Sequence, residues 1–133
     1  MKYIKILLVI VCLGAITGFY LYNKPVKSTS SRSADVAIQA EVIFNEFSKD
    51  ETAANTKYLD KVVSVEGVVT NIAVEDGLSI VTLRTASDMF GVICKIESGD
   101  EKVKKLKIGE EIRVKGVCTG MLMDVIMVRC VIE

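Results

Sequence analysis

Hydrophobic and polar positions divide the chain into three stretches. Residues 6–22 form an uncharged run of 17 residues, preceded by Lys2 and Lys5. Its length lies at the low edge of what spans a bilayer, and Ile4 with a snorkelling Lys5 would extend it. We therefore predict that residues 1–23 are a transmembrane anchor or a signal segment. The anchor is favoured, because residues 16–18 make a poor cleavage site and Val11 is bulky for a lipoprotein signal ending at Cys12.

Residues 24–33 predict a short flexible linker, because they are rich in serine and hold the only proline. From there the apolar period becomes helical, and Ser33 or Asp35 is a candidate cap. The apolar positions of this predicted amphipathic helix are Val36, Ala40, Ile43, Phe44 and Phe47. Asp50 is predicted to cap a second short helix, residues 51–58, and Tyr58 with Leu59 to close one end of the folded domain.

From Lys61 onward the period is two, which indicates β-strands. We predict strands at residues 62–72, 78–84, 89–96, 111–119 and 124–132, with a loop at 86–88 and a short helix at 101–106. Gly67 in the first strand indicates a bend that lets one strand serve both halves of a closed barrel.

The fold class that follows is mainly β. It is a five-stranded OB-fold Greek-key barrel (residues 34–133) with an N-terminal amphipathic helix and a short helix between strands three and four, preceded by a transmembrane helix. An SH3-like barrel shares much of this strand pattern and is the alternative.

Three segments resemble the tRNA-anti-like OB-fold family, a bacterial group often found behind an N-terminal membrane segment. They are AANTKYLDKVVSVEGVVTNI (53–72), GVICKI (91–96) and VKGVCTGMLMDVIMVRCVI (114–132). The resemblance implies the OB-fold. It implies no activity, because one fold carries many functions.

Charge limits the function classes. Four of the 17 Lys and Arg residues lie within residues 1–27, whereas all 17 Asp and Glu residues come later, so residues 28–133 carry a net charge of −4. Nucleic-acid affinity depends largely on basic charge, which makes an obligate nucleic-acid binder unfavourable. The chain has no His, and no nucleophile or metal-binding motif is recognisable. We therefore expect no enzyme activity, no cofactor and no metal site.

Charge leaves the membrane orientation open, since Lys2 and Lys5 are matched by Lys24, Lys27 and Arg32. An N-terminal anchor ahead of one small domain usually exports that domain. We predict a single-pass inner-membrane protein with the barrel on the exocytoplasmic (periplasmic) side. The alternative is secretion after signal cleavage.

Cys94, Cys118 and Cys130 all lie in predicted inward registers. In the last strand that register is Ile126, Val128, Cys130 and Ile132. Three interpretations remain: buried cysteines acting as small apolar groups, a Cys118–Cys130 disulfide in an oxidising compartment, and a thiolate metal or redox centre.

Three functions compete. The first is a membrane-tethered, non-enzymatic module that binds an unknown partner, a protein or peptide, through the apolar loop residues Met121, Leu122 and Met123. The second is single-stranded nucleic-acid binding on strands two and three through Phe90, Arg84 and Lys95. The third is a thiol-dependent enzyme or sensor. The run Lys102, Lys104, Lys105 and Lys107 is interpreted as a solvated helix face.

Overall fold

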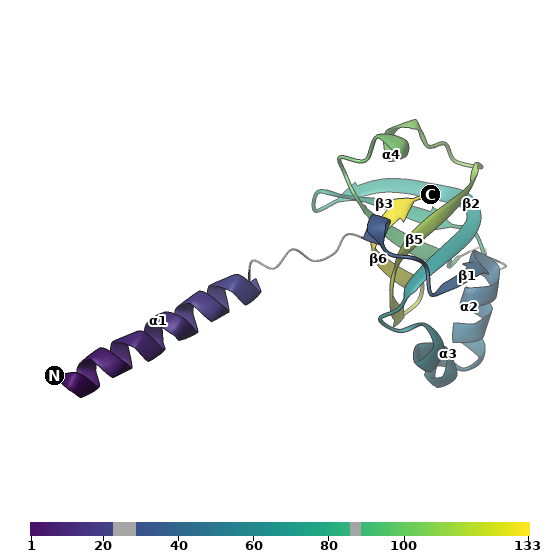
Figure 1. Cartoon of the computed structure of the whole chain (residues 1–133). Coiled ribbons are helices and arrows are strands. Elements are labelled where there is room, and N and C mark those ends of the chain that lie inside the picture. Colours follow the sequence, from purple (N-terminus) through teal and green to yellow (C-terminus); the bar gives the residue numbers. More distant parts are fainter. Residues whose placement is uncertain (23–28, 86–88) are drawn as a thin grey trace.

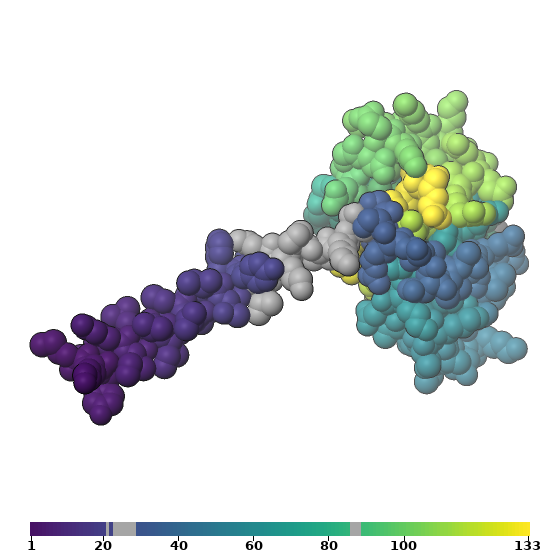
Figure 2. Space-filling view, in the orientation of Figure 1, coloured from purple at the N-terminus to yellow at the C-terminus, as the bar shows by residue number. Residues whose placement is uncertain are grey.

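The computed structural model describes residues 1–22, 29–85 and 89–133. Residues 24–28 of the predicted linker and the predicted loop 86–88 therefore lie outside the described residues. The first element is helix α1 (Lys2–Tyr22), whose segment Lys2–Tyr20 is long and apolar enough to cross a membrane, with a mean hydropathy of 2.0. None of that segment is buried against the rest of the protein (Figures 1 and 2). The helix is a candidate membrane span or signal sequence.

The predicted start of the next helix is wrong. After the short 3-10 helix η1 (Thr29–Ser31), residues Val36–Gln39 form strand β1, which pairs in parallel with β2 (Val62–Glu75). Asp35 does not cap a helix. Its carboxylate accepts a hydrogen bond from Val62 N at 2.9 Å, and its N–H donates to Val62 O at 2.7 Å. Neither contact is visible in local periodicity, because Val62 is distant along the chain.

Helix α2 (Ala40–Lys49) begins where β1 ends and buries the predicted apolar face, Ala40, Ile43, Phe44 and Phe47. Asp50 starts α3 (Glu51–Tyr58) as predicted, since its side chain accepts from Ala53 N at 3.0 Å. Tyr58 is fully buried beside Phe47 and donates its hydroxyl to Glu46, whereas Leu59 is exposed. The two helices therefore cover one side of the barrel, and Tyr58 packs into the core there as predicted. Leu59 does not take part in this packing.

Strand β2 serves both halves of the barrel, as Gly67 indicated. Its first half pairs with β5 (Glu111–Met121) and its second half with β3 (Leu78–Leu83). A Cβ atom at Gly67 would lie 3.0 Å from Ala40 Cβ and 3.2 Å from Leu83 Cβ. The missing side chain therefore lets α2 approach the strand closely.

The remaining strands complete the closed barrel. Strand β4 (Val92–Glu97) pairs with β3 and, in parallel, with β6 (Val125–Ile132), and β6 pairs with β5. The order is β1-β2-β3-β4-β6-β5, closed by β2–β5 (Figure 1). Helix α4 (Glu101–Lys105) lies between β4 and β5. This is the predicted five-stranded OB-fold barrel, with β1 added as a sixth strand that the sequence analysis missed.

The predicted inward register of the last strand is wrong in part. Val125 and Met127 are fully buried, whereas Ile126 and Val128 lie on the outer face. A β-bulge then adds one residue at Arg129, whose φ is +51°, and returns Cys130 to the interior. A bulge exchanges the two faces of a strand. Strict alternation therefore cannot predict the inward residues correctly both before and after Arg129.

Candidate binding surface

The turn between β5 and β6 exposes the apolar side chains that the sequence singled out. Gly120 has a φ of +106°, and the Leu122 N–H donates to Asp124 O at 3.2 Å. Leu122 is 86% exposed and Met123 is 60% exposed, whereas Met121 is half-buried and packs against the core. The turn thus combines an anchored residue with two residues held in solvent.

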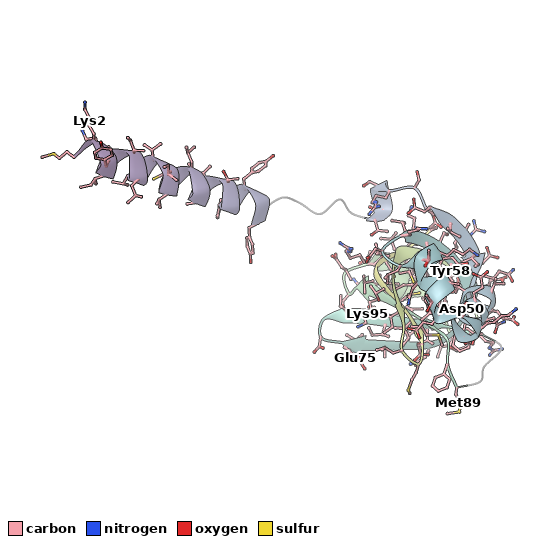
Figure 3. The ribbon with its side chains drawn as sticks, turned by 90° about the horizontal axis from the view of Figure 1, so that it is seen from below. Lys2, Asp50, Tyr58, Glu75, Met89 and Lys95 are labelled. Atoms are coloured by element: carbon pink, nitrogen blue, oxygen red, sulfur yellow. The ribbon has the colours of Figure 1, made fainter. Side chains whose placement is uncertain are left out.

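A second segment is held beside this turn. Gly91 N–H donates to the Asp124 carboxylate at 2.7 Å, and Val125 N–H donates to Gly91 O at 3.1 Å. These bonds hold Gly91, just before β4, beside Asp124 and Val125 at the end of the turn, so the chain that carries Met89 and Phe90 enters β4 next to the turn. Met89 is 82% exposed and projects outward (Figure 3), while Phe90 is half-buried against the core. We call this group the tip surface; its members are Met89, Phe90, Met121, Leu122 and Met123.

A groove of about 400 Å³ lies next to the tip surface. It separates α3 from the β5–β6 turn, and its apolar lining is Leu59, Met121, Leu122 and Ile126. Glu51 and Asn55 of α3 add polar atoms along one wall. The groove could therefore bind an apolar side chain of a partner, while its polar wall offers hydrogen bonds to the partner's neighbouring groups. Sequence reasoning missed Leu59 and Ile126 because both had been assigned to the interior.

The residues of the nucleic-acid hypothesis do not form one basic strip. Arg84 is exposed just beyond β3, next to the segment that carries Phe90. Lys95 lies on the outer face of β4 and pairs across the sheet with Ile80. The next outward pair on these strands joins Leu78 to Glu97. Among the described residues, this face therefore offers mixed charge and aliphatic side chains in place of stacked aromatics.

The three cysteines of the barrel are buried, unbridged thiols. Cys118 lies opposite Met127 in the β5–β6 register. The Cys94 thiol donates a hydrogen bond to the sulfur of Cys130, and this bond together with burial raises the pKa of Cys94 well above its usual value. The arrangement places Cys130 beside Cys94, whereas the disulfide considered from the sequence would join Cys130 to Cys118. In the described parts of the chain, no three His, Cys, Asp or Glu residues are grouped to hold a metal ion.

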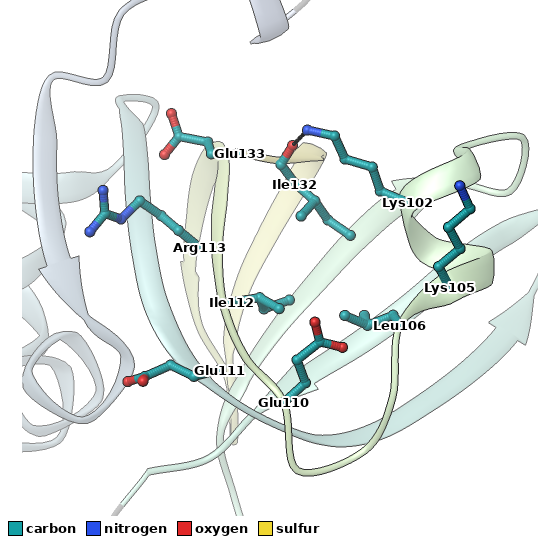
Figure 4. A pocket seen from close by; sticks show the side chains of 9 residues that line it. All are labelled: Lys102, Lys105, Leu106, Glu110, Glu111, Ile112, Arg113, Ile132 and Glu133. Carbon is teal, nitrogen blue, oxygen red and sulfur yellow. Dashed lines mark hydrogen bonds between the residues drawn. The ribbon is translucent and has the colours of Figure 1, made fainter.

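A second groove, of about 370 Å³, opens between α4 and the ends of β5 and β6 (Figure 4). Lys102 donates to Ile132 O at 2.7 Å, and Lys104 pairs with Glu101 at 2.6 Å. The lining carries three basic and three acidic side chains: Lys102, Lys105, Arg113, Glu110, Glu111 and Glu133. This near balance of charge favours neither an anion nor a cation.

The topology and the long, twice-paired β2 define the class: the folded domain is an OB-fold protein. The family follows from the sequence. The model of the tRNA_anti-like family matches residues 1–132, so the chain belongs to that family. No curated protein matched the chain.

The chain matches solved structures, of which three are described below. The first is a "putative nucleic acid-binding lipoprotein" from Klebsiella pneumoniae subsp. pneumoniae. It is 18% identical, with a TM-score of 0.61, over 83% of this chain and 99% of that one.

The second is the Stn1–Ten1 complex of S. pombe, 15% identical with a TM-score of 0.42, over 50% of this chain and 52% of that one. The third is an OBody bound to hen egg-white lysozyme, 15% identical with a TM-score of 0.44, over 57% of this chain and 84% of that one. At 18% identity, the similarity to the Klebsiella protein speaks for the fold alone.

Proposed function

We propose that this protein is a membrane-tethered, non-enzymatic binding module that holds a protein or peptide partner outside the cytoplasm. The tip surface is the contact. Helix α1 serves as the tether, and the OB-fold barrel presents the tip surface at a limited distance from the bilayer.

One observation carries the proposal: Met89, Leu122 and Met123 are 60–86% exposed. The two segments that carry them are joined by two hydrogen bonds, from Gly91 N–H to the Asp124 carboxylate and from Val125 N–H to Gly91 O. Contiguous exposed apolar groups on a soluble domain mark interaction sites. Methionine adapts its shape to a partner, and the groove beside it adds depth for one apolar side chain. An apolar peptide segment fits this surface better than a nucleic-acid backbone does.

The absence of enzyme activity is supported by the side chains themselves. The chain contains no His for acid–base work. The thiols of Cys94, Cys118 and Cys130 are at most 3% exposed, so no substrate reaches them in the folded state. The grooves hold carboxylates and ammonium groups that are exposed and already paired in part.

The second candidate is binding of single-stranded nucleic acid on the β3–β4 face. It is favoured by the Klebsiella protein, which is described as nucleic acid-binding and shares the fold. Against it stand the net negative charge of residues 28–133 and the acidic neighbour Glu97 on that face. The tip surface has no acidic side chain among its members. It is therefore the better candidate for a binding site than the β3–β4 face.

Photocrosslinking in native membranes tests the proposal. A photoreactive amino acid replaces Leu122 in the full-length protein, and the matched control carries it at Val74, which is 70% exposed. We expect a discrete protein adduct at position 122 that is absent at 74. Adding Met123→Asp should lower its yield roughly tenfold, as losing about 1.4 kcal/mol of binding predicts. Thermal unfolding should stay within about 0.5 kcal/mol, because residue 123 is on the surface.

The same protein also tests the second candidate. Fluorescence anisotropy with a labelled single-stranded oligonucleotide, at low and at moderate salt, should show no salt-sensitive binding. Binding that Lys95→Ala weakens would favour the nucleic-acid function. Equal adduct yields at positions 122 and 74 would contradict the role of the tip surface.

A further inference from the structure

Two of the buried thiols are already in contact. Cys94 of β4 and Cys130 of β6 are 0% and 3% exposed, and the Cys94 thiol donates its hydrogen bond to the sulfur of Cys130. The strands that carry them are parallel neighbours, in which Ile96 pairs with Cys130 and Cys94 pairs with Met127. The bulge at Arg129 produces this juxtaposition, because without it position 130 would lie on the outer face of the barrel.

Gly116 of β5 completes the geometry. A Cβ atom at position 116 would lie only 2.4 Å from the Cys130 sulfur, so this sulfur occupies the space above a glycine. Cys118 has a different environment. It lies opposite Met127, and its sulfur accepts a hydrogen bond from Gly120 N–H. The Cys130 sulfur therefore has two neighbours, Gly116 and the Cys94 thiol that donates to it, whereas the Cys118 sulfur is bonded to Gly120 N–H.

We propose that Cys94 and Cys130 form a disulfide bond that joins β4 to β6 inside the barrel. This rests on the part of the proposed function that places the domain outside the cytoplasm, where disulfides persist. The oxidant is a protein or small-molecule disulfide. One thiolate attacks it and forms a mixed disulfide, and the second thiolate displaces the remaining thiol. Two protons leave Cys94 and Cys130, and two electrons reduce the oxidant to its two thiols.

The bond forms while the chain is folding. In the folded barrel both sulfurs are shielded from any oxidant, and the raised pKa of Cys94 keeps that thiol protonated. Once formed, the buried disulfide is shielded from reductants in the same way. It closes the segment between residues 94 and 130, which contains α4, β5 and most of β6.

Peptide mapping separates the candidate pairs cleanly. Trypsin cleavage after Lys or Arg places Cys94 in residues 85–95, Cys118 in residues 116–129, Cys130 in residues 130–133 and Cys12 in residues 6–27. The full-length protein in detergent is denatured and refolded in a mixture of oxidised and reduced glutathione. It is then alkylated under denaturing conditions without reductant, digested and analysed by mass spectrometry. The same mapping is applied to protein isolated from its native membrane.

We expect peptide 85–95 linked to peptide 130–133, with Cys12 and Cys118 alkylated. Cys118→Ala should leave the link intact, whereas Cys94→Ala should abolish it and lower the melting temperature of the oxidised protein by about 10 °C. A link that joins residues 116–129 to 130–133, or alkylation of all three barrel cysteines after refolding, would overturn the proposal.

The two proposals can fail separately. A link that forms in the glutathione mixture but is missing from membrane-isolated protein would refute the exocytoplasmic location and the native disulfide, while leaving the tip surface untouched. Conversely, the link can be present in both preparations while the adduct at position 122 is missing, which would refute the binding function alone.

Discussion

The β5–β6 hairpin has two ends that differ in almost every physical respect. At its base Gly116 has no room for a methyl group and Cys130 is 3% exposed. At its turn Leu122 is 86% exposed, although it belongs to the same hairpin. The base binds the hairpin into the barrel, and the rigidity it provides lets the turn present apolar side chains without collapsing onto the core. Stability and binding are thus placed at opposite ends of one element.

The largest effect should follow from filling the base. Gly116→Ala would place a Cβ atom 2.4 Å from the Cys130 sulfur and 3.1 Å from Val128 O, so the sulfur or the neighbouring strand must shift. We expect a loss of about 1–3 kcal/mol in the free energy of unfolding, measured by chemical denaturation. Gly99→Ala is the matched control, since its Cβ atom meets nothing within 4 Å. Its effect should stay within about 0.5 kcal/mol.

A double-mutant cycle makes this test sharper. Cys130→Ala removes the obstructing sulfur, so Gly116→Ala should cost clearly less in that background than in the wild type. Additive losses would contradict the contact that we assign to the base.

An intermediate effect should come from Asp124, which joins the turn to the segment of Met89 and Phe90. Asp124→Ala leaves the buried Gly91 N–H without its acceptor and should cost about 1–2 kcal/mol. It should also weaken the crosslink at position 122, because Met89 loses its support. Asp124→Asn keeps an oxygen acceptor and should retain most of both. Equal losses in the two variants would mean that the charge, and not the hydrogen bond, is what matters.

The smallest effect depends on pH and concerns the base again. Ser64 donates a hydrogen bond to the Glu133 carboxylate, and this bond, together with nearby Lys115, lowers the pKa of Glu133 below its ordinary value of 4.5. A lowered folded-state pKa stabilises the protein above about pH 4.5, and this contribution is lost as the pH falls through the folded value.

Ser64→Ala should therefore reduce the free energy of unfolding at pH 7, and the difference from wild type should shrink toward pH 3. Ser98→Ala, at an exposed hydroxyl that donates to Gly77 O, is the control and should show a difference that does not vary with pH. A wild-type advantage that persists at pH 3 would exclude Glu133 as its source.

Local sequence rules predicted much of this protein because several features depend only on neighbouring residues. The uncharged run of residues 6–22, the cap at Asp50 and the strand pattern after Lys61 all have local causes. They were sufficient for the five-stranded OB-fold barrel and for the exposure of Leu122 and Met123. The inward direction of Cys94 and Cys118 followed from the same alternation.

The tertiary structure decided what depends on distant partners. Residues 36–39 have a helical apolar period, yet Val62 and its neighbours bind them as strand β1. The bulge at Arg129 reverses the faces of β6, so Cys130 meets Cys94 and Ile126 joins the groove beside the tip surface. Periodicity records which side of an element is apolar, whereas strand pairing across the barrel determines which residues that side meets.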